Sequence, residues 1–141
     1  MTVDNFLPEE DVEFLISKEI PYRLRVDQIQ GQERRGIEFV EFPVPANLVQ
    51  FSDGQWKAGG AARVLVVIPA GYARTKLDSW YLSPGLYRPG GVAIDRANGQ
   101  ADLFGETWQF WSRHLDDADW RFGRDGLATY YQYIQAGLMS A

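Results

Sequence analysis

The sequence is organised around one segment, Trp108-Gln109-Phe110-Trp111-Ser112-Arg113-His114-Leu115. This segment holds the only histidine of the chain, and together with Trp120 it holds three of the five tryptophans. Aromatic rings bury large apolar areas and fix the geometry around them. We therefore expect the hydroxyl of Ser112 and the imidazole of His114, which lie two positions apart, to be held firmly.

A purely structural interpretation of the same segment stays open. Ser112 would then be a helix cap or a hydrogen-bonded loop hydroxyl, and His114 would hold the loop by a bond to a backbone carbonyl. The carboxylates that follow would form a solvated turn (Asp116, Asp117 and Asp119). The tryptophans would belong to the core rather than to a ligand-binding surface (Trp108, Trp111 and Trp120).

Composition limits the class of protein. The chain has 141 residues, 45% of them hydrophobic, which suffices for a single domain over residues 1–141 with a sizeable core. A net charge of −5 argues against a nucleic-acid partner, because phosphate binding needs a basic surface. The absence of cysteine excludes disulfides, thiolate metal sites and a thiol nucleophile. With no secretory signal and no apolar run long enough to span a membrane, we expect a cytoplasmic protein without a membrane partner.

The spacing of apolar residues predicts two helices, one near each end. Residues 7–18 have helical spacing, with Asn5 as the candidate cap, Pro8 in the first turn, and Leu15 and Ile16 on the apolar face. Asp125 is the candidate cap of the second helix. The apolar face of that helix comprises Leu127, Tyr130, Tyr131, Ile134 and Leu138.

Between the helices we expect four strands in an antiparallel meander. Their predicted ranges are 22–26, 37–42, 64–68 and 79–82, with a polar turn at 30–36 and a loop at 47–60. Frequent proline and glycine predict mostly irregular structure over 83–104, with Asn98-Gly99 as a turn. Long loops of this kind are often functional, so an irregular active-site loop is expected before the second helix. The fold class is α+β.

This order of elements resembles the ubiquitin-conjugating (UBC) fold. Ile68-Pro69-Ala70-Gly71-Tyr72 is similar to the Pro-x-x-Tyr-Pro turn of that family, although Ala73 stands at the second proline. In the family, the catalytic cysteine lies eight residues before a tryptophan that leads into a helix. Here Trp120 leads into the second helix, and the residue eight positions before it is Ser112.

The chain from residue 7 to 138 is similar to a divergent bacterial branch of this family. The similarity lies in Leu-Pro-Glu-Glu-Asp at 7–11, Trp-Gln-x-Trp-Ser-Arg-His at 108–114, and Trp-x-x-Gly-x-Asp-Gly-Leu at 120–127. Genes of that branch tend to lie beside genes for multi-ubiquitin-like proteins, a ThiF-type activating enzyme and a JAB-type metallopeptidase, a setting that implies phage defence. Two features depart from the family: the cysteine is absent, and so is the His-Pro-Asn triplet expected within 83–107. A natural serine, or a serine replacing cysteine to trap an ester, fits the sequence equally.

A serine hydroxyl is a weak nucleophile and needs a general base. His114 is the only imidazole, and Asp116, Asp117 or Asp119 could orient it in the manner of a catalytic triad. Residues two apart do not face each other on a helix. The pair therefore requires an extended or turned segment over 111–115, unless His114 serves an incoming substrate instead.

Three hypotheses follow. The first is a conjugating enzyme that carries a ubiquitin-like protein as an oxyester on Ser112, with His114 assisting. The second is a non-catalytic UBC-like module that binds the ubiquitin-like protein or its activating enzyme. The third is a small hydrolase or transferase that uses the same two residues on an unrelated small substrate. It is least favoured because the sequence has no Gly-x-Ser-x-Gly elbow, and no phosphate cradle or metal-ligand cluster implies a cofactor or metal. The residues expected to shape the site or bind substrate are Trp108, Trp111, Arg113, Asp117, Trp120 and Tyr72.

By resemblance to the family, we expect partners to contact three surfaces. These are the first helix, where the activating enzyme would bind, and the loops at 69–72 and 83–88.

Overall fold

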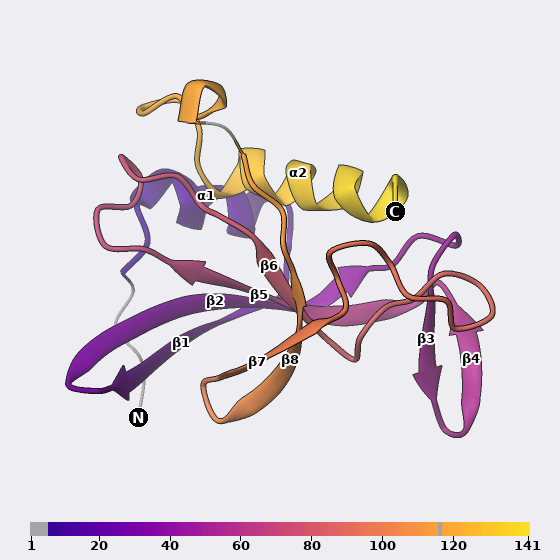
Figure 1. The fold of residues 1–141 in the computed structure, drawn as a ribbon. Helices are drawn as coiled ribbons and strands as arrows, with labels where there is room; N and C mark the ends of the chain where they lie inside the picture. The colour runs from indigo at the N-terminus through magenta and orange to yellow at the C-terminus, as the bar shows by residue number, and fades with distance from the viewer. Residues whose placement is uncertain (1–5, 116) are drawn as a thin grey trace.

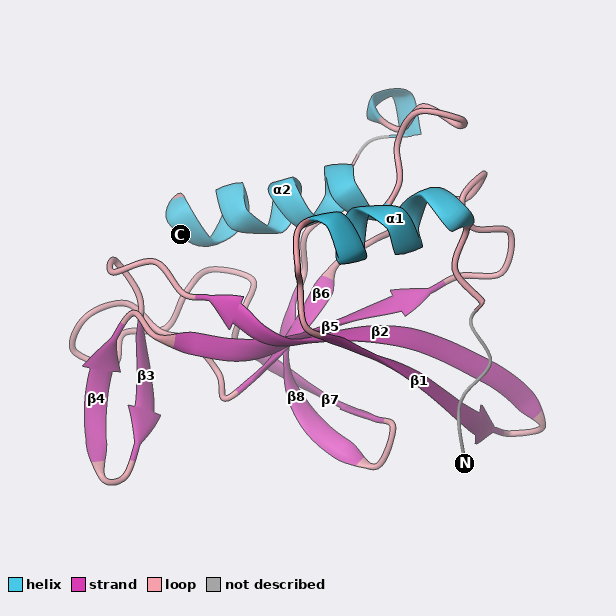
Figure 2. Ribbon diagram, turned by 180° about the vertical axis from the view of Figure 1, so that it is seen from behind, coloured by secondary structure: helices cyan, strands magenta, loops and turns pink. Residues whose placement is uncertain are grey.

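A computed structural model describes residues 6–115 and 117–141. It is an α+β fold in which both helices lie on one face of an antiparallel sheet (Figures 1 and 2). The helices are α1 (Glu9–Ser17) and α2 (Leu127–Met139), with a short 3-10 turn η1 (Asp117–Asp119) between β8 and α2. The strands are β1 (Tyr22–Ile29), β2 (Gln32–Pro43), β3 (Val49–Ser52), β4 (Gln55–Ala58), β5 (Ala61–Ile68), β6 (Trp80–Ser83), β7 (Gly99–Leu103) and β8 (Glu106–Trp111).

The main sheet contains the predicted four-stranded meander and extends beyond it. Its strand order is β1-β2-β5-β6-β8-β7, all antiparallel, so β1, β2, β5 and β6 form the meander. β7 lies within the range 83–104 that is predicted to be mostly irregular, and β8 follows it in the expected active-site loop. Gly99 begins β7, so the predicted Asn98-Gly99 turn is wrong. The β3–β4 hairpin forms a separate two-stranded sheet to one side of the main sheet (Figure 1).

Three two-residue turns explain why the structure has more strand than predicted. Gln30-Gly31, Asp53-Gly54 and Phe104-Gly105 all have positive φ at both positions, as type I′ hairpin turns require. The first turn is therefore shorter than the predicted 30–36, and the predicted loop 47–60 contains a hairpin. Asp-Gly is a strong sequence signal for such a turn, whereas Phe-Gly is not.

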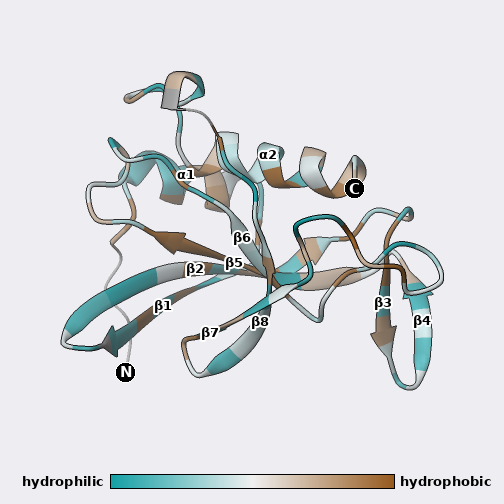
Figure 3. Ribbon diagram, viewed as in Figure 1, coloured by the Kyte–Doolittle hydropathy of each residue, from teal (hydrophilic) through white to brown (hydrophobic). Residues whose placement is uncertain are grey.

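The main core lies between the sheet and the helices. The brown colour of β5 in Figure 3 shows how apolar this central strand is. Trp80 and Trp111 stack at 5.8 Å between ring centroids, and both are fully buried. A Cβ at Gly137 of α2 would lie 2.6 Å from the Trp80 ring, so the helix packs closely here only because this residue has no side chain. On α1, Leu15 is buried as predicted, but Ile16 is exposed.

The N-terminus of α2 is capped from α1. The residue before α2 is Gly126, which has no side chain to offer, and Asp11 instead accepts the N–H of Leu127 at 3.1 Å. The same carboxylate accepts the hydroxyl of Tyr72 at 2.5 Å. The predicted cap Asp125 is wrong, because its carboxylate bonds to the preceding loop and to a threonine within the helix. The predicted cap Asn5 of the first helix lies outside the described residues, and Pro8 is the residue before α1.

A charged network lies on the sheet between β1, β2, β5 and β8. Glu38 is fully buried and pairs with Arg25 at 2.5 Å and with Arg23 at 2.9 Å. Glu106 pairs with Arg63 at 2.7 Å and with Arg25 at 3.1 Å. The contacts of Glu106 join β8 to β1, at the opposite edge of the main sheet, and to the central strand β5.

The bridge made by Asp11 predicts a large effect on stability. Replacing Asp11 with Ala leaves the N–H of Leu127 uncapped and the Tyr72 hydroxyl without its acceptor, so we expect unfolding free energy to fall by about 2 kcal/mol. Chemical denaturation of the variant measures this loss. Glu10→Ala, which removes an exposed carboxylate of the same helix, is the control, and equal losses in the two variants would contradict the assignment.

The charged network predicts a pH dependence. Hydrogen bonding from Arg63, and secondarily from Arg25, lowers the pKa of Glu106 in the folded chain. The ion pairs of Glu106 with the two arginines therefore stabilise the fold fully above the unfolded pKa of this carboxyl. This stabilisation is lost as pH falls through the lowered pKa of Glu106 in the folded chain. On acidification from neutral pH, the unfolding free energy of the parent falls. We expect it to fall by about 1 kcal/mol less in Glu106→Gln, which has no carboxylate to protonate at this position. Denaturation across acidic pH tests this, with Glu33→Gln as the matched exposed control; unchanged pH dependence of Glu106→Gln would contradict it.

Candidate functional site

Ser112 and His114 lie where β8 ends. The segment that follows Trp111 is not helical, so the two side chains can meet although they are only two residues apart. Ser112 Oγ lies 3.3 Å from His114 Nε2. The extended geometry that the predicted pair requires is therefore present.

The carboxylate that contacts His114 comes from a different segment than predicted. Asp78, just before β6, places its two oxygens 3.0 and 3.2 Å from His114 Nδ1. Of the predicted carboxylates, Asp116 lies outside the described residues and so does the side chain of Asp117, while Asp119 is exposed in η1. In the sequence, Asp78 is marked only by its place directly before the predicted strand 79–82.

Ser79 fixes the backbone on which this site is built. Its N–H donates to the carbonyl of Arg113 at 2.9 Å, and its Oγ accepts the Arg113 N–H at 3.2 Å. Its own carbonyl accepts the Tyr130 hydroxyl of α2 at 2.7 Å. Ser79 is buried and has a φ of 57°, so the chain turns sharply here, next to Asp78.

Arg113 holds the backbone turn at 95–96 beside the candidate site. Its guanidinium donates to the carbonyls of Arg96 at 3.1 Å and Asp95 at 3.2 Å, and it lies 4.9 Å from the ring centre of Trp111. Burial, followed by the nearby Arg96, lowers the pKa of its guanidinium. The N–H of Ser112 also donates to the Arg96 carbonyl, at 2.8 Å. The turn at 95–96 is thus held against the site.

The predicted site-shaping aromatic residues support the segment from within. Trp108, Trp111 and Trp120 are buried, as the structural interpretation of the sequence expects. The Trp120 indole donates to the Ala73 carbonyl at 2.8 Å, which attaches the chain beyond the site to the turn that contains Tyr72. The hydroxyl of Tyr72 is directed to the Asp11 bridge, and burial raises its pKa.

The site is open to solvent. The side chains of His114 and Asp78 are 61% and 46% exposed. A groove of about 420 Å³ adjoins them, lined by Arg34, Val67, Pro69, Thr75, Lys76, Asp78 and Tyr81. Such a surface suits an extended protein segment, whereas small-molecule sites bury most of their ligand.

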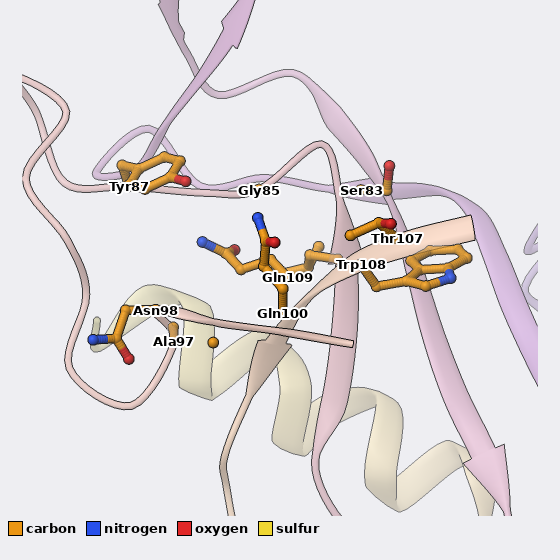
Figure 4. Close-up of a pocket in the computed structure, with 11 residues that line it drawn as sticks. Ser83, Gly85, Tyr87, Ala97, Asn98, Gln100, Thr107, Trp108 and Gln109 are labelled. Carbon is orange, nitrogen blue, oxygen red and sulfur yellow. The ribbon is translucent and has the colours of Figure 1, made fainter. Parts of the chain in front are cut away.

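A second pocket includes neither Ser112 nor His114 in its lining. It has a volume of about 150 Å³, and the polar side chains of Asn98, Gln100, Thr107 and Gln109 help to line it (Figure 4). The amide of Gln109 is already bonded to the backbone of Leu86 and to an indole N–H. The pocket is small, and the buried amide of Gln109 is engaged in hydrogen bonds within the fold rather than available to a ligand.

Two further properties concern the described residues only. No group of three or more His, Asp or Glu side chains there is arranged to hold a metal ion. None of the helices in that part of the chain has the length and apolar character needed to cross a membrane.

The contacts of Ser79 predict that it holds the site together. We expect Ser79→Ala to lower stability by about 1–2 kcal/mol, because the N–H of Arg113 loses a buried acceptor. The variant should also broaden the NMR signals of His114, which depends on this backbone for its position. Ser17→Ala, which removes an exposed hydroxyl, is the control, and unchanged stability and His114 signals in Ser79→Ala would contradict the role.

Comparison with known proteins identifies one family. The matching family is described as prokaryotic E2 family E, and the match covers residues 7–141. No curated protein and no solved structure matches the chain.

Proposed function

Because the chain belongs to prokaryotic E2 family E, we propose that it receives the carboxyl end of a ubiquitin-like protein and transfers it onward, carrying it as an oxyester on Ser112. The single observation that supports this chemistry is the 3.3 Å contact between Ser112 Oγ and His114 Nε2. Ser112 lies eight residues before Trp120. The chain acts as one domain over residues 1–141.

His114 supplies what a serine lacks in comparison with a thiol. As Ser112 Oγ bonds to the activated carbonyl carbon, His114 Nε2 takes the hydroxyl proton, the bond from that carbon to its leaving group breaks, and the imidazolium gives the proton to the departing group. In the second step the attacking amine bonds to the ester carbonyl carbon, His114 takes the proton that the amine loses, and the oxygen of Ser112 departs with that proton. The exposure of His114, the partial exposure of Ser112 and the groove lined by Asp78 support access of a protein tail to the hydroxyl.

The partners we propose are a ubiquitin-like protein and a ThiF-type activating enzyme, with a JAB-type peptidase encoded nearby. All would act in the cytoplasm, in a pathway of phage defence. The surface offered to the activating enzyme is α1, which exposes Glu9, Glu10 and Glu13 beside Ile16. The loops at 69–72 and 83–88 complete the proposed contact surfaces.

A second candidate function is a binding module that performs no covalent chemistry. The exposed Ile16 favours it, since 67% of this apolar residue is accessible on an otherwise acidic helix face. Such a surface would bind a partner whether or not Ser112 reacts.

A reconstituted transfer reaction separates the two functions. The purified chain is mixed with ATP and with the activating enzyme and ubiquitin-like protein encoded beside it. We expect an adduct that base and hydroxylamine cleave, that Ser112→Ala abolishes, and that Ser112→Cys converts to a thioester cleaved by reducing agents.

Ser140→Ala, at an exposed serine just after α2 and outside the proposed contact surfaces, is the matched control and should form the adduct at the parent level. Complex formation without any adduct, unchanged in Ser112→Ala, would contradict the transfer reaction and support the binding module.

A further inference from the structure

We propose that Asp78 is a positioning residue, which holds His114 in the one tautomer able to accept the proton of Ser112. The inference rests on the proposed function, because it adds a third group to the same site. Together the three side chains would form a serine–histidine–aspartate relay assembled from two separate segments of the chain.

A one-residue shift in strand register sets up this arrangement. The ladder pairs Trp80 of β6 with Trp111 of β8, so regular pairing would continue with Ser79 opposite Ser112. The N–H of Ser79 instead donates to the carbonyl of Arg113, one residue farther along. The N–H of Ser112 donates to the carbonyl of Arg96, outside the β6–β8 ladder.

The shift brings the carboxylate and the imidazole together. Continued from Ser79 and Arg113, the shifted pairing places Asp78 opposite His114, and residues directly opposite in an antiparallel pair share one face. In the regular register Asp78 would lie opposite Arg113, and neighbouring positions along a strand point to opposite faces. Register shifts of this kind redirect side chains beside active sites.

The contact with Asp78 determines which imidazole nitrogen carries the proton. A carboxylate 3.0 Å from Nδ1 accepts a hydrogen bond from it, so neutral His114 keeps its proton on Nδ1. Nε2 is then a free acceptor, 3.3 Å from Ser112 Oγ. The other tautomer would direct the Nε2–H at the hydroxyl and could not take its proton.

The tautomer can be measured directly, because His114 is the only histidine in the chain. Two-bond ¹H–¹⁵N spectra at about pH 9, where histidine is ordinarily neutral, distinguish the two ring nitrogens. We expect the intact protein to show Nδ1–H alone, and Asp78→Asn to show a mixture with Nε2–H. Asp53→Asn, the same change in the exposed β3–β4 turn, should leave the spectrum unchanged.

Reactivity is measured without any partner protein, with p-nitrophenyl acetate as the probe. In this step Ser112 Oγ bonds to the acetyl carbon, p-nitrophenolate leaves, and the hydroxyl proton passes to His114 Nε2. Mass spectrometry of the peptide containing Ser112 gives the acylation rate. We expect Asp78→Asn to lower this rate about tenfold or more, and Asp53→Asn to leave it unchanged.

The outcomes separate the role of Asp78 from the proposed function. An Nε2–H tautomer in the intact protein, or acylation of Asp78→Asn at the parent rate, overturns the positioning role. If Ser112→Ala and His114→Ala lose acylation while Asp78→Asn retains it, only this inference fails. If no acyl group is found on Ser112 in the intact protein, the nucleophile of the proposed function fails as well. Denaturation of Asp78→Asn, expected within about 0.5 kcal/mol of the parent, excludes loss of fold as the cause.

Discussion

The hydrogen bonds between Ser79 and the backbone of Arg113 are the constraint on which the site depends. They attach the end of β8 to the chain before β6 one residue out of register, and the Tyr130 hydroxyl ties the same point to α2. The sheet, the second helix and the Ser112–His114 segment are thereby joined at one buried residue. His114 is largely exposed and has little packing of its own, so these backbone bonds contribute strongly to its position.

The far end of the site segment is attached in a comparable way. The Trp120 indole bonds to the Ala73 carbonyl, and the Tyr72 hydroxyl next to it bonds to Asp11, which caps α2. One carboxylate thus links α1, the turn after β5 and the start of α2. Bonds to Ser79 and to Ala73 thus attach the chain on both sides of the candidate site, and Ser112 and His114 lie close to the bonds made by Ser79.

Much of the fold could be predicted from the sequence, because apolar periodicity identified both helices and four strands of the meander. The β7–β8 hairpin was missed, since proline and glycine before it indicated a loop and Phe104-Gly105 is a weak turn signal. The cap of α2 was missed for a different reason: Asp125 is adjacent in sequence, whereas Asp11 is brought there by tertiary structure.

The candidate site shows the same limit. The pairing of Ser112 with His114 could be expected because the two residues are neighbours in the sequence. Asp78 could not, because its position depends on strand register and on the positive φ of Ser79. Neither property is visible in the order of residue types. The predicted carboxylates were chosen for being near His114 in sequence, and the described contact is instead with a residue 36 positions away.

The central claim is that Ser112 is the residue that carries the tail of a ubiquitin-like protein. The most direct test is to isolate the chain from cells that contain its gene neighbours, digest it at acidic pH, and locate the attached tail by tandem mass spectrometry. We expect a tail remnant esterified to Ser112. A remnant found only on lysine side chains, or on none, would contradict it.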